Sequence, residues 1–540
     1  MKTRLTLLAL LVCMALGSTF LLLTTQAGTL PLYRVDLAPA SKACTGCTSI
    51  YTVTSLSPDP VTATHTFFDT GTPTAVYSFT DVLASGAPVP YDLADVSGLP
   101  DGFTGTVGIN SAQQITATLD PCPWRPSRVH LPLLVRGWEN LPAPVTPDDP
   151  HYAAYQWNLP QIRAPYAWAV STGGAEIVIA VVDTGVDLDH PDLATKLVAG
   201  YDFANDDDCP DDDHGHGTHV AGIAAAATNN GTGIAGLSWG ARIMPLKALS
   251  AGSGTVFDTA EAIIYAADHG AQVINLSIGG TEASSTLQDA VDYAHGKGAL
   301  IVAAAGNCGD QNYAANGCST MNQPLYPAAG NHTLAVASTG ATDERSSFSN
   351  VGSYVDVAAP GSYIWSTYPG TYSARSGTSQ SAPHVAGLAA LVWSRNPTLS
   401  NDQVEQVIES TAADLGEIGR DDAYGHGRID AYRAVSRAPD WTSTHMPEAG
   451  TTYGPGAGEA AFESGIVLVK LRPGNEKPDF FRKTWFLAHE QPGFLPTGCI
   501  SAVGVLRLNV PEGMESEISQ RLRQDPAVEY AEPNYVVRAF

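Results

Sequence analysis

Four continuous apolar runs in the middle of the chain constrain its fold more than any other feature. The runs lack polar alternation, and they are Ile177–Val182, Val273–Leu276, Leu300–Ala305 and Thr333–Ala337. Helical patterns lie between runs of this kind, for example at Thr259–Asp268 and Leu287–His295. Strands that are apolar on both faces and are separated by helices indicate a parallel sheet covered on both sides. The sequence therefore predicts an α/β domain.

One edge of this sheet is where chemistry is expected. In open α/β sheets, ligands bind outside the carboxyl ends of the strands. Asp183, Ser277 and Asn307 come just after three of the apolar runs. We therefore expect these three polar side chains to lie at the functional edge.

Three segments of the same region combine the residue types that nucleophilic acyl transfer requires. They are Val181–Gly185, His214–Gly222 and Ser376–His384, and they supply an Asp, a His and a Ser in this order. A serine hydroxyl is a poor nucleophile at neutral pH, so an imidazole must take its proton and a carboxylate must orient that imidazole. The three segments together predict a catalytic triad.

These motifs resemble those of subtilisin-like serine proteases, and Asp149 to Arg437 closely resembles the thermitase branch of that family. The resemblance implies a serine endopeptidase that acts on proteins and peptides. Carried onto matching positions, it implies Asp183 as the orienting carboxylate, His216 as the general base and Ser379 as the nucleophile. Asn307 matches the family's side-chain donor to the oxyanion.

Two predicted helices agree with these roles. Ser379 precedes a helix expected over Ala382–Trp393, so its backbone amide and the helix dipole would face the developing oxyanion. His216 opens a helix expected over Thr218–Ala227. A helix cap would be the simpler interpretation of either motif alone, whereas three motifs in this order favour catalysis.

A zinc site is the alternative for the histidine motif. His214, His216 and His219 form an H-x-H-x-x-H cluster beside the acidic run Asp206–Asp213. Zinc ligands often lie this close in sequence. The zinc hypothesis leaves Asp183, Asn307 and Ser379 without a role, and we therefore prefer the triad.

The resemblance also implies where a substrate would bind. The expected cleft edges are two glycine-containing segments, formed by Ser277, Ile278, Gly279 and Gly280 and by Gly252, Ser253 and Gly254. Glycine suits such edges because a substrate strand must approach the main chain closely. Leu325, followed by Tyr326 and Pro327, is expected to border the primary specificity pocket and to favour apolar or aromatic residues.

Structural calcium is the expected cofactor, and no organic cofactor is implied. Matching positions indicate a first site built from three side chains and three carbonyls: Asp149, Asp192, Asn230, Ala227, Thr232 and Ile234. Such mixed oxygen ligands suit calcium. A second site would use Asp202, Asp207 and Asp211, and a solvated acidic loop is the competing interpretation of the same run.

The residues around the catalytic region divide into further segments. The predicted segments are a signal peptide 1–27, a β-sandwich 28–136, a Pro-rich linker 137–148, the peptidase domain 149–437, a linker 438–464 and a small α+β unit 465–540. Short period-two runs punctuated by Pro, Gly and Asp indicate the β-sandwich. A signal peptide predicts secretion, with an uncleaved membrane anchor as the alternative, and we find no second apolar stretch that could span a membrane.

The net charge limits the classes of partner that the protein can bind, and the cysteines indicate the redox state of its compartment. The formal net charge of −26 argues against nucleic acid as a partner, and we expect a monomer. Seven cysteines remain once Cys13 leaves with the signal. An oxidising compartment favours a local disulfide between Cys308 and Cys318, and a second one from Cys44 or Cys47 to Cys122.

The C-terminal unit is out of place for the family. Strands over Ile466–Leu471 and Val503–Val510, a helix over Met514–Gln524 and a strand over Ala527–Val537 predict a small ferredoxin-like fold. Two of these stretches resemble the family's inhibitory pro-domain, which normally precedes the catalytic domain. One interpretation is a permuted pro-domain whose tail Val536–Phe540 lies in the cleft, with the Phe540 carboxylate near Ser379.

Three other interpretations stay open at this stage. The chain could stop short before a second catalytic domain, or the C-terminal unit could be an interaction domain without access to the cleft. The whole protein could also be a cell-surface adhesion protein that carries a vestigial protease domain. The presence of all the triad residues and of Asn307 argues against the last.

Overall fold

The structure is a computed structural model. Between residues 4 and 120 it describes ten strand segments, and beyond them it describes residues 141–417, 419–441, 461–473 and 496–539. The chain divides into two compact units, Met1–Leu141 and Pro142–Phe540. The predicted linker residues 442–460 and Phe540 lie outside the described residues, as do the side chains of Cys44, Cys47 and Cys122. No described helix is both long enough and apolar enough to cross a bilayer.

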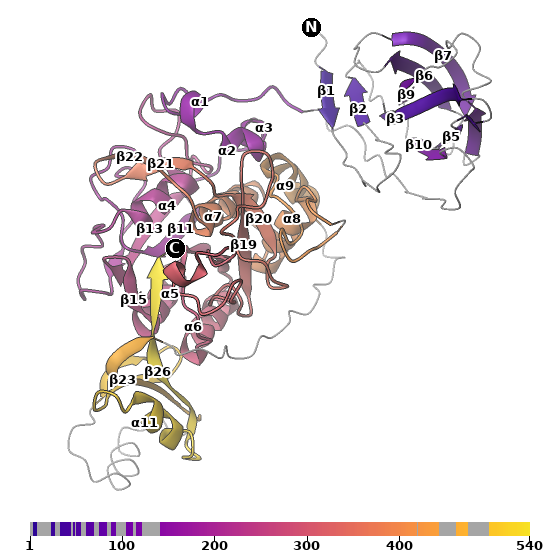
Figure 1. The fold of residues 1–540 in the computed structure, drawn as a ribbon. Helices are drawn as coiled ribbons and strands as arrows, with labels where there is room; N and C mark the ends of the chain where they lie inside the picture. Colours follow the sequence, from indigo (N-terminus) through magenta and orange to yellow (C-terminus); the bar gives the residue numbers. More distant parts are fainter. Residues whose placement is uncertain are drawn as a thin grey trace. The chain divides into compact units, whose positions relative to one another are not determined.

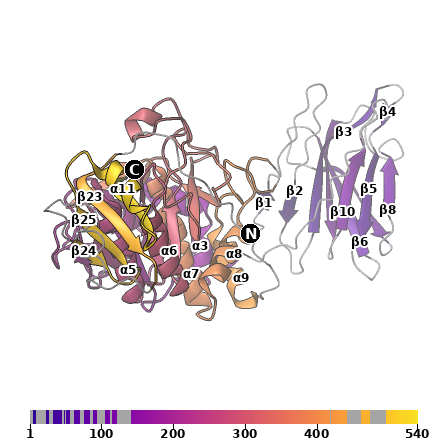
Figure 2. The ribbon, with the colours of Figure 1, turned by 90° about the horizontal axis from the view of Figure 1, so that it is seen from below.

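The first unit consists of antiparallel strands (Figures 1 and 2). A five-stranded sheet has the order β4-β3-β9-β6-β7, a three-stranded sheet has the order β10-β5-β8, and β1 pairs with β2. The strands are β1 Arg4–Leu7, β2 Leu23–Gln26, β3 Tyr33–Cys44, β4 Cys47–Thr48, β5 Ile50–Ser55, β6 Val61–Asp69, β7 Ala75–Leu83, β8 Pro88–Asp92, β9 Thr104–Ser111 and β10 Ile115–Asp120. Antiparallel pairing agrees with the period-two pattern, while the sandwich and the signal peptide stay predictions.

The second unit is built on a seven-stranded sheet with the order β12-β13-β11-β16-β18-β19-β20 (Figure 1). Every neighbouring pair in it is parallel. Its strands are β11 Val178–Asp183, β12 Tyr201–Asp202, β13 Arg242–Lys247, β16 Val273–Leu276, β18 Leu300–Ala304, β19 Thr333–Thr339 and β20 Val357–Pro360. The parallel α/β fold and the four predicted strands are confirmed.

Helices cover both faces of this sheet. Ile179 and Val181 belong to one apolar core with helices α4 and α7, whereas Ala180 and Val182 belong to another with α5 and α6. Successive residues of β11 therefore bury side chains on opposite faces, as the continuous apolar run requires. The helices are α1 Tyr152–Tyr155, α2 Asn158–Gln161, α3 Ala164–Trp168, α4 His216–Ala225, α5 Val256–Asp268, α6 Ser285–Gly296, α7 Thr378–Arg395, α8 Asn401–Thr411 and α9 Ala431–Arg437, with 3₁₀ turns η1 Tyr313–Asn316 and η2 Ala438–Asp440.

Two helix starts differ from the sequence prediction. Helix α7 begins at Thr378 rather than Ala382, so Ser379 lies inside its first turn. Pro383 lies within the helix, where its missing N–H leaves the Ser379 carbonyl without a helical donor. The Ser277 hydroxyl donates to that carbonyl instead, at 2.8 Å. Helix α4 likewise begins two residues early, at His216.

The small C-terminal unit is an antiparallel sheet with one described helix. Its elements are β23 Phe462–Leu471, β24 Pro496–Ile500, β25 Val505–Asn509, α11 Glu515–Leu522 and β26 Val528–Ala539, and the strand order is β26-β23-β25-β24. The strands at 466–471, 503–510 and 527–537 and the helix at 514–524 are confirmed with small changes of boundary, whereas β24 was not predicted. Trp441 still packs in the catalytic core, so that core extends beyond Arg437.

Strand β26 is longer than the sheet to which it belongs. Its first part pairs with β23, and its last residues leave the small unit and run along the catalytic domain (Figure 1). There they pair with the short strands β15 Ser253–Thr255 and β17 Ile278–Gly279. Strand β15 forms a hairpin with β14 Leu249–Ser250, and β21 Ile364–Tyr368 forms one with β22 Thr371–Arg375.

Candidate active site

An aspartate and a histidine meet at the carboxyl edge of the parallel sheet. Asp183 is the last residue of β11, and His216 is the first residue of α4. The His216 Nδ1 atom lies 2.7 Å from Asp183 Oδ1 and 3.0 Å from Oδ2. Both side chains are buried. A buried carboxylate on Nδ1 fixes the ring orientation and leaves Nε2 as the nitrogen available for proton transfer.

Asp212 holds the start of the histidine helix, and the sequence analysis missed it. Its carboxylate accepts hydrogen bonds from the main-chain N–H groups of Gly215 at 2.8 Å and Thr218 at 2.9 Å. It also accepts one from the Thr184 hydroxyl at 2.8 Å, next to Asp183. An acceptor that satisfies the free N–H groups of a first helical turn stabilises the helix start. Asp212 therefore ties the start of α4 to the end of β11.

Ser379 lies in the first turn of α7 and is fully buried. Its hydroxyl donates to the Ser277 carbonyl at 2.8 Å, and the Ser277 hydroxyl donates back to the Ser379 carbonyl at 2.8 Å. Ser277 immediately precedes β17. This reciprocal pair joins the start of the helix to the strand that borders the cleft.

Asn307 is anchored to the same helix start. Its Oδ1 atom accepts hydrogen bonds from the Thr378 N–H at 2.9 Å and from the Thr378 hydroxyl at 3.0 Å. The Thr378 hydroxyl in turn accepts the Gly306 N–H at 3.0 Å. With Oδ1 engaged in this way, the Nδ2 group is the side of the amide that can donate to a ligand. Thr378 is a second residue that sequence analysis did not single out.

The three histidines of the H-x-H-x-x-H motif do not converge on one point. His219 Nε2 lies 3.1 Å from the carbonyls of both Ile364 and Ser373, and burial lowers the pKa of His219 to about 3. His216 faces Asp183 instead, and the ring of His214 is centred 6.4 Å from that of His216. Within the described ranges, no three His, Cys, Asp or Glu side chains are grouped to hold a metal ion. This geometry argues against the zinc hypothesis.

Both predicted cleft edges pair with an extended strand, which is the chain's own β26. On one side Ser253 is the register partner of Arg538, and Gly254 that of Val537. On the other side Gly279 is the partner of Arg538, and Ile278 that of Ala539. The Ala539 N–H also donates to the Gly252 carbonyl at 3.1 Å. The strand thus lies between the two edges as a third strand.

Gly280 shows why an edge of this kind needs glycine. A Cβ atom at this position would lie 2.9 Å from the Val536 carbonyl oxygen, which is closer than real Cβ atoms approach. Gly280 also exchanges two main-chain hydrogen bonds with Tyr326, at 2.8 and 2.9 Å. A side chain at Gly280 would therefore push the entering strand away.

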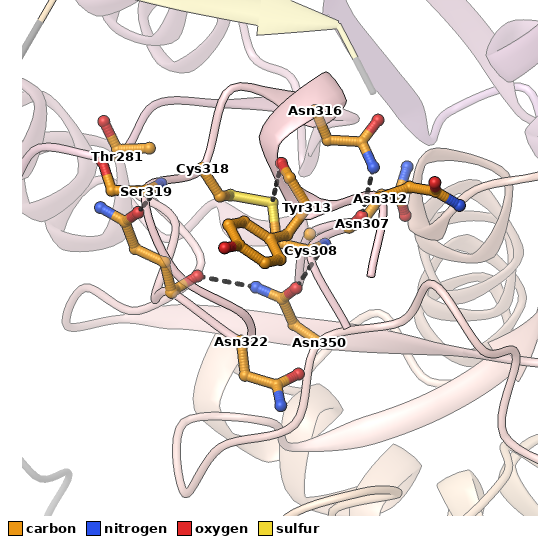
Figure 3. Close-up of a disulfide and its surroundings, with 12 residues drawn as sticks. Thr281, Asn307, Cys308, Asn312, Tyr313, Asn316, Cys318, Ser319, Asn322 and Asn350 are labelled. Carbon is orange, nitrogen blue, oxygen red and sulfur yellow. Dashed lines mark hydrogen bonds between the residues drawn. A yellow bond between two sulfur atoms is a disulfide. The ribbon is translucent and has the colours of Figure 1, made fainter. Parts of the chain in front are cut away.

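The predicted disulfide between Cys308 and Cys318 is present (Figure 3). Together with Leu325 it forms a small buried apolar cluster, against which Tyr313 packs. Leu325 is only 1% exposed, because its side chain contacts this cluster. The insertion between the two cysteines thus determines the surroundings of a residue that was expected to border an open pocket.

The proposed ligands of the first calcium site lie together. Asp149 accepts the N–H groups of Asn229 and Asn230, and Asp192 accepts the N–H of Ile234 at 2.9 Å. Further contacts join Asp192 to Asn230, Ala227 and Tyr372, and Asn230 to Thr232. Neither carboxylate forms an ion pair with Lys or Arg in the part of the chain that the structure describes. Burial and the nearby Asp192 raise the pKa of Asp149. Such a concentration of oxygen atoms fits calcium.

The second predicted calcium site is not assembled. Asp202 accepts the N–H of its neighbour Asn205 at 2.9 Å, Asp207 that of Cys209 at 2.8 Å, and Asp211 that of Leu188 at 3.3 Å. Asp202 and Asp207 thus stabilise their own turns, and Asp211 joins the acidic run to Leu188. These contacts favour the alternative interpretation, in which the acidic run is a loop stabilised by hydrogen bonds.

Comparison with known proteins places these observations in a family. Residues 174–427 match the family described as the subtilase family, Peptidase_S8. The chain is 50% identical over 293 residues to "Thermitase" of Thermoactinomyces vulgaris, covering 54% of this chain and 99% of that protein. It is 48% identical to the "Thermophilic serine proteinase" of Bacillus sp. (strain AK1), over 54% and 69% of the two chains. It is 40% identical to the "Halolysin-like extracellular serine protease Nep" of Natrialba magadii, over 60% and 59%.

Proposed function

Because this chain belongs to the subtilase family and is a serine-type endopeptidase, we propose that Ser379 is its nucleophile and His216 its general base, oriented by Asp183. The observation that carries the proposal is the buried Asp183–His216 pair at the edge where α7 presents Ser379. Asn307 is the side-chain donor to the oxyanion, since Thr378 holds its Oδ1 atom. The complete set of groups argues against the adhesion-protein alternative.

The mechanism follows from these positions. The hydroxyl of Ser379 turns from the Ser277 carbonyl toward His216, which accepts its proton while the serine oxygen attacks the scissile carbonyl. His216, oriented by Asp183, later returns the proton to the leaving amine. The developing oxyanion receives hydrogen bonds from Asn307 Nδ2 and from the N-terminal amides of α7, whose dipole favours negative charge there. An extended substrate binds between β15 and β17.

Inhibition of casein hydrolysis tests this assignment. A serine-directed fluorophosphonate should abolish the activity, and the label should be found on the peptide that contains Ser379. A chelator added briefly at a temperature where the fold is stable should leave most of the activity. The reverse pattern, sensitivity to the chelator and resistance to the fluorophosphonate, would favour metal-dependent hydrolysis.

We further propose that the C-terminal unit inhibits the catalytic domain in cis. The strand β26 occupies the same edges, β15 and β17, that a substrate needs. The C-terminal sheet also packs on the two helices below the cleft, because Leu468 and Val505 share one apolar cluster with Phe257 and Ile264 of α5. The unit is therefore a pro-domain-like inhibitor placed after its protease, and cleavage between residues 442 and 460 would release it.

Two polar side chains of β26 bind the N-termini of helices α5 and α6. The buried carboxylate of Glu532 accepts hydrogen bonds from the Ser284 hydroxyl at 2.7 Å and from the N–H groups of Ser285 and Thr286, both at 3.0 Å. Asn534 Oδ1 accepts the N–H of Phe257 at 3.0 Å. Helix N-termini attract negative charge and unpaired acceptors. These contacts orient the strand that enters the cleft.

Calcium removal is expected to lower the melting temperature. A site bound at about 100 times its Kd contributes about 2.7 kcal/mol, which corresponds to a Tm decrease of about 5–10 °C for a domain of this size. The comparison is thermal unfolding in calcium and in chelator. The double variant Asp149→Asn/Asp192→Asn should lose this difference, and an unchanged wild-type Tm in chelator would contradict the site.

A cavity at the junction with the C-terminal unit is lined by three carboxyl groups. It has a volume of about 460 Å³ and is lined by Tyr201, Phe203, Asp206, Phe257, Asp258, Glu261, Tyr265 and Arg507. Burial, reinforced by Asp258, raises the pKa of Glu261 from 4.5 to about 7, and burial raises that of Asp258 to about 6. Arg507 opposes both shifts, and it also pairs with Glu463.

Glu261 should make the folded chain less stable as the pH rises. Its raised pKa means that the folded state binds more protons than the unfolded state between about pH 4.5 and 7, so stability falls across this window and stays lower above it. Glu261→Gln removes the charge, and we expect it to raise Tm by about 2–4 °C at pH 8 but little at pH 5. The exposed Glu529→Gln is the matched control. An equal Tm change at both pH values would contradict this interpretation.

We also propose that the protein is secreted. The basic start and apolar run of residues 1–27 support this location, and a relative at 40% identity is named as an extracellular protease. N-terminal sequencing of the protein recovered from culture medium tests it.

A further inference from the structure

A loop that is closed by a disulfide directly follows the proposed oxyanion donor. Cys308 is the next residue after Asn307, and its sulfur is bonded to Cys318 (Figure 3). The enclosed segment contains the 3₁₀ turn Tyr313–Asn316. Gly317 follows this turn with a positive φ of 82°, which turns the chain back toward Cys318. The disulfide therefore keeps the end of the loop close to its beginning.

Because the loop turns back, Asn316 lies close enough to form a hydrogen bond with Asn307, the proposed oxyanion donor. Its Nδ2 group donates to the main-chain carbonyl of Asn307, as Figure 3 shows. The next N–H along the chain, that of Cys308, donates to Asn350 Oδ1 at 2.7 Å. Both polar groups of the peptide bond after Asn307 are thus held by asparagine side chains. Asn350 is fully buried and also donates to the Gln323 carbonyl at 2.8 Å.

We propose that Asn316, held in place by the Cys308–Cys318 disulfide, is a positioning residue for Asn307. Thr378 fixes the side-chain oxygen of Asn307, and Asn316 fixes its main-chain carbonyl. Together they determine where the Nδ2 donor points. A misplacement of about 1 Å of a transition-state donor costs much of its contribution, which is about 10²- to 10³-fold when such a donor is removed. This inference rests on the proposed role of Asn307.

The test is a double-mutant cycle in the full chain, with kcat expressed per fluorophosphonate-titrated active site. We expect Asn316→Ala to lower kcat by about tenfold with little change in KM, since the donor acts in the transition state. Asn316→Asp, which keeps the size but removes the donor, should do the same. Asn312→Ala is the matched control on the same loop, because the Asn312 contacts with Asp310 and Ala315 use its main-chain N–H and carbonyl. It should match the wild type.

The decisive measurement is the effect of Asn316→Ala on kcat in a protein that already carries Asn307→Ala. If Asn316 acts through Asn307, Asn316→Ala should cause almost no further loss there. Inhibition by a peptide aldehyde, whose adduct places an oxyanion in the same hole, should weaken in parallel with kcat/KM. An equal tenfold loss in both backgrounds would overturn the inference and leave the proposed function intact. An unchanged kcat for Asn307→Ala alone would overturn both.

A separate variant tests the role of the disulfide. Cys308→Ser/Cys318→Ser should lower kcat in the same direction as Asn316→Ala, and adding Asn316→Ala to it should cost little more. Wild-type kcat in the double serine variant would overturn the role of the disulfide.

Discussion

Ser379→Ala is expected to lower kcat for casein hydrolysis by on the order of 10⁶-fold, the size of the loss that follows removal of the nucleophile from a triad of this type. The variant removes the oxygen that forms the acyl intermediate, while Asn307 and the α7 amides keep their places. A residual rate above that of water is therefore expected. Substrate binding should persist, because the edges β15 and β17 are unaltered.

A neighbouring serine provides the matched control for this variant. Ser381 lies two residues further along α7 and is also fully buried, and its hydroxyl has no hydrogen-bond partner among the residues that the structure describes. Ser381→Ala should retain wild-type activity per titrated active site. Comparable losses in both variants would indicate damage to α7 and would contradict the assignment of Ser379 as the nucleophile.

Glu532→Ala is expected to raise the activity of the full chain on a small peptide substrate by about 10- to 100-fold. The wild-type carboxylate binds three donors at the start of α6, and a hydrogen bond to a charged group has a net contribution of about 1.5–3 kcal/mol. Losing about 1.4–2.8 kcal/mol of net docking energy shifts the docking equilibrium by 10- to 100-fold. The cleft edges are then free for substrate more of the time.

Glu529 offers a control on the same strand. It is exposed, so Glu529→Ala changes the net charge by the same amount without removing a contact to α6. Its activity should equal that of the wild type. If Glu532→Ala and Glu529→Ala give the same activity as the wild type, β26 does not limit access to the cleft, and the C-terminal unit has another role.

The parallel sheet and its functional edge could be predicted because they depend on local patterns. Runs such as Ile177–Val182 are apolar on both faces, and Asp183 and Asn307 come at their carboxyl ends. The segment containing Ser379 was located, but its helix begins at Thr378 rather than at the expected Ala382 and continues through Pro383. In the folded chain Ser277 replaces the hydrogen bond that the proline removes. Such compensation by a distant residue has no local signal.

The remaining differences have the same origin. The acidic run Asp206–Asp213 suggested metal ligands, yet Asp212 stabilises the start of α4, and Asp213 pairs with the buried Lys247. The contact of Asp212 depends on where helix α4 begins, and the contact of Asp213 depends on Lys247, which is remote in sequence. The position of β26 between the two cleft edges was anticipated because the C-terminal unit resembles the family's pro-domain. The contacts of Glu532 and Asn316 became visible only in the folded chain.

The most direct test of the account is the rate at which a peptidyl fluorophosphonate labels the protein. The probe requires both a reactive Ser379 and a cleft between β15 and β17 that is free of β26. We predict labelling at Ser379 that is slow in the wild type, about 10- to 100-fold faster in Glu532→Ala and unchanged in Glu529→Ala. Labelling at another residue would contradict the proposed nucleophile, and equal rates in all three proteins would contradict inhibition by the C-terminal strand.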